Sequence, residues 1–149
     1  MGGGAVNFCA ALVGLGWLLI GCQPAIGWRF GVYDDVAAEA KTQRKPLFVY
    51  FRNWYSVECT NFEEHVLSAR AVRDAVNSMV CVPLEYDVAA DRRLAESWGI
   101  KAVPAFAIVA ADGQVLETGS GALTAEALLA ALQRAQAKVA SASTLPALP

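Results

Sequence analysis

Two short apolar runs predict the buried strands of this chain. Residues 47–51 are continuously apolar and follow Pro46, which is typical of a strand buried on both faces of a sheet. Residues 79–86 form a second run, rich in β-branched and apolar side chains. Pro83 lies inside this run. Because proline cannot donate a ladder hydrogen bond, we expect this strand at a sheet edge, or a distortion there.

A hairpin and five helices complete the predicted order of elements. Asp112-Gly113 is a strong turn signal between expected strands over 105–109 and 114–117. Helical spacing or composition covers 36–42, 56–67, 68–76, 91–98 and a last segment whose apolar stripe is Leu128, Leu129, Leu132, Ala135 and Val139. Expected caps are Asp34 or Asp35, Ser68 and Thr124, with Gly99 ending a helix and Gly119 and Gly121 breaking the chain. This order predicts one α/β domain with a central mixed sheet flanked by helices.

The N-terminal segment has the pattern of an export signal. Residues 8–21 form an apolar run of about 14 residues, short of the roughly 20 that span a membrane. The run closes on Leu-Ile-Gly before Cys22, which resembles the lipobox of bacterial lipoproteins, where the signal is cut before a cysteine that then carries lipid. Residues 1–7 contain no Lys or Arg, so an ordinary signal or an uncleaved anchor stays an alternative.

An export signal with a lipobox predicts both the segments of the chain and its location. We expect a signal peptide over 1–21, lipid on Cys22 with a short tether over 22–33, a domain over 34–139 and a tail over 140–149. The protein would then be a membrane-tethered lipoprotein of the cell envelope that faces the periplasm. Gln23, rather than Asp, resembles the residue that follows the cysteine in outer-membrane lipoproteins.

Charge and histidine content make several classes of partner unexpected. The 149 residues carry 12 basic and 14 acidic side chains, well mixed, for a net charge of −2. The chain has no stripe of basic residues, so we do not expect it to bind nucleic acid. His65 is the single histidine and has no second ligand at metal-binding spacing, so we expect neither a metal site nor a cofactor.

A spaced motif in the middle of the chain resembles a known family. The motif consists, in order, of Lys-Pro, the apolar strand, Ser56-x-x-Cys59, Phe62-Glu63 and Ser68. No alignment gap is needed to match its spacing to that family. Val103-Pro104 then lies in a Gly-Ile-x-x-Val-Pro segment. Together these resemble the thioredoxin domains of DsbD-type thiol:disulfide interchange proteins. The resemblance covers about residues 34–135 and implies a thioredoxin-like fold with a cis Val103–Pro104 bond.

The same comparison reveals departures at the catalytic positions. Ser56 stands where the family has its attacking cysteine, and a hydroxyl forms no mixed disulfide. Tyr50 stands where the family commonly buries an acid, and Tyr55 replaces a tryptophan. We interpret Ser56 as a helix N-cap. Cys59 is interpreted as a thiol packed under the loop, with a lone reactive thiol as the alternative.

The remaining cysteines are not expected to pair. Cys9 would leave with the signal, and Cys22 would carry lipid. Cys81 lies near the start of its strand, and the six residues on to Asp87 span about 20 Å. Cys59 belongs at the far end of the sheet, so we expect no disulfide between Cys59 and Cys81.

Three functions are compatible with these residues. The first is a non-catalytic module that binds an extended peptide segment of an envelope protein beside Val103 and Pro104. Trp54, Tyr55 and Trp98 would form an aromatic rim for this partner, with Trp28 pinning the tether to the domain. The alternatives are a thiol:disulfide oxidoreductase acting through Cys59 alone, and a structural subunit of an envelope assembly.

Overall fold

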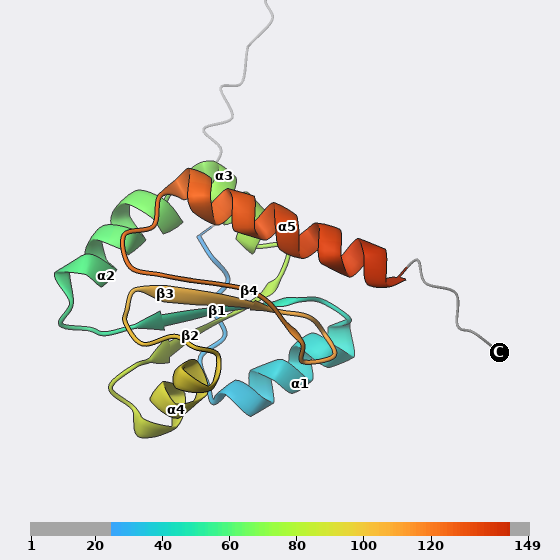
Figure 1. Cartoon of the computed structure of the whole chain (residues 1–149), viewed down its shortest axis with the longest axis horizontal. Helices are drawn as coiled ribbons and strands as arrows, with labels where there is room; N and C mark the ends of the chain where they lie inside the picture. Colours follow the sequence, from blue (N-terminus) through green and yellow to red (C-terminus); the bar gives the residue numbers. More distant parts are fainter. Residues whose placement is uncertain (1–24, 144–149) are drawn as a thin grey trace, which may run out of the picture.

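The computed structural model describes residues 25–143 and confirms the α/β prediction (Figure 1). A four-stranded mixed sheet has the order β2-β1-β3-β4, with β1 parallel to β2 and antiparallel to β3, and β3 antiparallel to β4. The predicted signal over 1–21, Cys22 and residues 144–149 lie outside the described residues. The elements are α1 (Tyr33–Gln43), β1 (Leu47–Arg52), α2 (Val57–Phe62), the π-helical turn η1 (Glu63–Leu67), α3 (Arg70–Val76), β2 (Val80–Glu85), α4 (Ala89–Ser97), β3 (Ala105–Val109), β4 (Val115–Ser120) and α5 (Ala125–Ser143).

Helices cover both faces of the sheet, as Figure 1 shows. Phe48 and Tyr50 of β1 pack into one apolar layer with α2, η1, α3 and α5. The alternate residues of the strand pack into a second layer with α1 and α4. Successive side chains of a strand point to opposite faces, so a strand covered on both sides must be apolar throughout. The run at 47–51 is therefore a central strand, as predicted.

Strand β2 lies at the edge of the sheet, as Pro83 predicted. The Cys81 carbonyl accepts a hydrogen bond from the Arg29 amide at 2.7 Å. The Glu85 amide donates to the Asp91 carboxylate at 3.1 Å. The Cys81 carbonyl and the Glu85 amide are therefore already hydrogen-bonded, and Pro83 has no N–H to donate. Few backbone groups of this edge remain available to pair with another strand.

Residues 25–32, which fall in the tether expected over 22–33, are docked on the domain. Trp28 forms a parallel bridge with Cys81, and its ring lies 6.3 Å from Phe48 and 6.0 Å from Tyr50, centroid to centroid. Asn77 holds the same segment by accepting from the Gly27 amide and donating to the Ala25 carbonyl. The prediction that Trp28 pins this segment is confirmed.

Two of the predicted helix caps are wrong. Helix α1 begins at Tyr33, so Asp34 and Asp35 lie in its first turn, where a carboxylate still suits the helix dipole. Ser68 ends η1 and its hydroxyl bonds back to the Glu64 carbonyl, whereas α3 begins after Ala69 without a side-chain cap.

The third cap is confirmed, and the two glycines before it behave differently. Thr124 accepts from the Ala127 amide at 3.2 Å at the start of α5. Gly121 has a φ of +85° and turns the chain, as expected. Gly119 does not break the chain: it lies inside β4, where a Cβ atom would come within 2.4 Å of the Phe106 ring. Only glycine leaves room for that ring.

Helix α5 runs to Ser143, past the expected start of the tail at residue 140. Glu117 of β4 anchors it through ion pairs to Lys138 at 2.7 Å and to Arg134 at 3.1 Å. Hydrogen bonds from Lys138 and then Arg134 lower the pKa of this carboxyl.

Across residues 25–143, we find no helix that is both long and apolar enough to cross a membrane.

Replacing Trp28 by alanine should lower the free energy of unfolding by about 2 kcal/mol, because the change empties a half-buried aromatic site on the core. Urea unfolding measures this. Phe30→Ala is the matched control, since Phe30 lies two residues on and is 80% exposed; its cost should stay under about 0.5 kcal/mol. Equal costs would show that the segment is not held by Trp28.

Glu117→Gln should lower the free energy of unfolding by about 1 kcal/mol at pH 7. The folded-state pKa of Glu117 is depressed, so its contribution is present above the unfolded value near pH 4 and is lost as pH falls through the folded value. The difference from wild type should therefore shrink below about pH 4. Glu96→Gln on α4 serves as control, and a pH-independent difference at Glu117 would contradict the ion-pair account.

Candidate functional site

The Ser56 hydroxyl is committed within its own loop. Ser56 is the N-cap of α2, and its Oγ accepts from the Cys59 amide at 3.2 Å, as predicted. The hydroxyl proton goes to Glu58 Oε2 at 2.8 Å. Asn53 shapes the same loop: its side-chain oxygen accepts from the Tyr55 amide, and its amide group donates to Asp87. Ser56 therefore caps α2 and hydrogen-bonds the Glu58 carboxylate.

Cys59 is buried under this loop, as predicted. Its side chain is 2% exposed, and its Sγ accepts from the Asn53 amide at 3.4 Å. Both described cysteines are free thiols, so no disulfide joins Cys59 to Cys81. Cys81 pairs in register with Phe48, five residues before Asn53, a distance of about 16 Å along the strand. Burial raises the pKa of the Cys81 thiol to about 12.

Tyr50, which stands where the resemblance implies a buried acid, forms a polar cluster with Glu63 and Arg52. Its hydroxyl lies 3.2 Å from Glu63 Oε1 and 3.4 Å from the Cys59 carbonyl. Burial, followed by the Glu63 charge, raises the pKa of this phenol far above its ordinary value. Tyr50 therefore stays protonated near neutral pH and cannot serve as the proton acceptor that an acid would provide.

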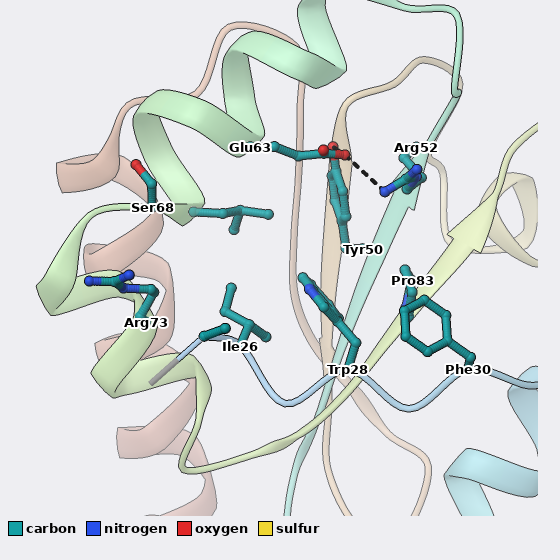
Figure 2. A pocket seen from close by; sticks show the side chains of 11 residues that line it. Ile26, Trp28, Phe30, Tyr50, Arg52, Glu63, Ser68, Arg73 and Pro83 are labelled. Carbon is teal, nitrogen blue, oxygen red and sulfur yellow. Dashed lines mark hydrogen bonds and ion pairs between the residues drawn. The ribbon is translucent and has the colours of Figure 1, made fainter. Parts of the chain in front are cut away.

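Figure 2 shows this cluster at one end of a cavity of about 230 Å³. Arg52 pairs there with Glu63 at 3.2 Å and with Glu85 at 3.0 Å. Desolvation, against the Arg52 charge, raises the pKa of Glu85. Trp28, from the docked N-terminal segment, forms an apolar wall of the same cavity. Every charged group in this cluster has a partner, which marks it as a structural link between β1, β2 and η1.

The predicted aromatic rim is not assembled as expected. Trp54 and Tyr55 are exposed, at 69% and 92%, as their loop position implied. Trp54, however, lies over the Arg52 guanidinium, 3.5 Å from ring centroid to carbon. Trp98 is half-buried, with its ring against Tyr33 and Phe51. None of the three predicted rim residues lines the groove beside Pro104.

A groove does run between α2 and the Val103–Pro104 loop, and that peptide bond is cis, as predicted. We call it the cis-proline groove; its volume is about 360 Å³. Val103 makes no hydrogen bond to any other described residue, so its backbone N–H and C=O are open. The lining residues are Glu58, Asn61, Phe62, His65, Val66, Val103, Pro104, Gly121, Ala122 and Leu123.

Sequence reasoning missed the polar side of this groove. Glu58, Asn61 and His65 all come from one face of the α2–η1 segment, beside Phe62 and Val66. Their spacing of three and four residues was the available signal.

Within residues 25–143, no group of three or more His, Cys, Asp or Glu side chains could hold a metal ion.

Known proteins resemble this chain in fold. The C-terminal domain of Neisseria meningitidis DsbD in its reduced form aligns with a TM-score of 0.58 and 18% identity over 71% of this chain and 98% of that domain. A Thermus thermophilus thioredoxin gives 0.68 and 20% over 79% and 94%. DsbH oxidoreductase gives 0.60 and 13% over 74% and 85%. No curated protein matches the sequence. A family model described as the thioredoxin-like domain matches residues 33–136, and the chain therefore belongs to that family.

Proposed function

We propose that this protein is a membrane-tethered thioredoxin-like module of the cell envelope that binds an extended segment of a partner protein without thiol exchange. One observation carries the proposal: the catalytic positions are closed while the cis-proline groove is open. The Ser56 hydroxyl accepts from the Cys59 amide and donates to Glu58, and the Cys59 sulfur is buried. The groove beside them keeps its space and its open backbone.

The loss of exchange chemistry follows from what the reaction needs. A disulfide is attacked by an accessible thiolate through a mixed-disulfide intermediate. Ser56 contributes no sulfur, and Cys59 is too enclosed for a substrate sulfur to approach in line. Tyr50 holds its proton, so no buried base stands ready behind Cys59.

The binding role is supported by the shape and chemistry of the groove. An extended segment adds to exposed backbone groups through main-chain hydrogen bonds, and neighbouring pockets select its side chains. Val103 supplies the open N–H and C=O. Phe62, Val66 and Leu123 supply apolar walls beside it.

Membrane attachment is proposed through lipid on Cys22, with the outer membrane the better fit because Gln23 follows. Ala25 is already fixed to the domain by Asn77. Three residues reach at most about 10 Å, so the domain would sit against the lipid headgroups. A partner would then be met at the membrane surface.

The full chain, solubilised in mild detergent, should not reduce insulin with dithiothreitol as electron source. Turbidity from precipitating insulin B chain measures this. Ser56→Cys restores the first sulfur but neither an acid at Tyr50 nor an accessible Cys59, so that variant should show partial activity at best.

Cys59→Ala is the matched control for this assay and should be as inactive as wild type. Wild-type turnover that Cys59→Ala abolishes would overturn the proposal, because the single buried thiol would then carry out exchange.

Cells supplied with radiolabelled palmitate should label the wild-type chain and leave Cys22→Ala unlabelled. The physical reason is that the run before Cys22 is too short to span a bilayer and serves as a signal. Cys9→Ala is the control and should keep its label. Equal labelling of wild type and Cys22→Ala would exclude lipid attachment at this cysteine.

A further inference from the structure

The described lining of the cis-proline groove carries a negative charge and no balancing Lys or Arg. Glu58 is its one carboxylate, and no Lys or Arg of the described residues lines it. The remaining walls are apolar apart from Asn61 and His65. A segment lying in this groove would therefore meet a single anion beside an apolar surface.

Glu58, the one carboxylate of the groove, has no cationic partner within residues 25–143. Glu39, Glu63, Glu85 and Glu117 each form an ion pair with an arginine or lysine. Glu58 forms none within residues 25–143, and its described side-chain partner is the Ser56 hydroxyl. Its own backbone amide, then the Ser56 hydroxyl, lower the pKa of this carboxyl. The group is thus an oriented, persistent anion with room for a cation.

We propose that Glu58 selects the partner: the cis-proline groove takes an extended protein segment that places a Lys or Arg against Glu58 and apolar side chains on Phe62 and Leu123. This inference rests on the proposed function and names the chemistry of its ligand. Charge complementarity carries it, since an unpaired carboxylate attracts a basic side chain and repels an acidic one.

Ser56 is the positioning residue in this arrangement. Its Oγ is fixed by the Cys59 amide at 3.2 Å and donates to Glu58 Oε2 at 2.8 Å. The carboxylate is thereby held in the first turn of α2, and its second oxygen faces no described partner. The exchange of cysteine for serine at this position adds the hydroxyl that orients Glu58.

The test uses three isotope-free heptapeptides, Thr-Val-Thr-X-Thr-Val-Thr, with X as Lys, Gln or Glu. They are titrated into the ¹⁵N-labelled full chain in mild detergent, and the amide resonances of Val103 and Gly121 report occupancy of the groove. We expect the Lys peptide to bind about ten-fold more tightly than the Glu peptide, with Gln between them. The preference should weaken as salt is added.

Glu58→Gln should reduce the Lys-to-Glu ratio to about one while leaving the Gln peptide nearly unchanged. Glu64→Gln is the matched control, because Glu64 is exposed on the same segment and lies outside the groove lining. It should keep the ten-fold ratio. Ser56→Ala should give an intermediate ratio with unaltered Gln-peptide affinity, which a merely structural role would not produce.

The outcomes separate this inference from the proposal beneath it. Equal affinity for the three peptides at Val103 and Gly121, or a Lys preference that survives Glu58→Gln, overturns the role of Glu58 and leaves the binding module standing. A titration in which no peptide shifts either resonance overturns the binding module, and the inference falls with it.

Discussion

The burial of β1 on both faces is the constraint on which the rest of the structure depends. Phe48 and Tyr50 fill one layer, and Leu47, Val49 and Phe51 fill the other. A strand held so completely fixes the point where the chain must leave the sheet. Asn53 follows at that point, and its amide meets the Cys59 sulfur. The closed Ser56–Cys59 loop is thus a consequence of where the core places the end of one strand.

Most of the fold could be predicted from sequence because its signals are local. A continuous apolar run, a proline at an edge and helical spacing each act within a few residues, and the structure keeps them. The docking of Trp28 was predicted, but its partners were not, because Asn77 and Cys81 lie about fifty residues away in the sequence. Gly119 was misread for the same reason: the Phe106 ring that excludes a side chain there belongs to another strand.

In the candidate site, too, the features set by local sequence could be predicted and those set by side-chain contacts could not. Ser56 as cap and Cys59 as buried thiol follow from their places at the start of a helix, and both predictions hold. The direction of Trp54 could not be predicted, because Arg52 draws the ring over its guanidinium. Sequence proximity placed the aromatic residues near the groove, but side-chain contacts decide which of them line it. Glu58 lines it instead.

The resemblance predicts a cysteine where this chain has Ser56, and that difference concerns more than one atom of the site. A thiol at this position would be valuable when exposed and ionised, whereas the Ser56 hydroxyl is useful because it stays protonated and donates to Glu58. Negative charge beside the groove is then carried by a carboxylate in place of a sulfur. A carboxylate attracts a partner without forming a bond to it, and its charge does not depend on the redox state of the compartment. Binding through such a site would be reversible and sensitive to salt, the opposite of a mixed disulfide. On the proposed function, the fold has kept the groove of an exchange enzyme and replaced its covalent step with electrostatic selection.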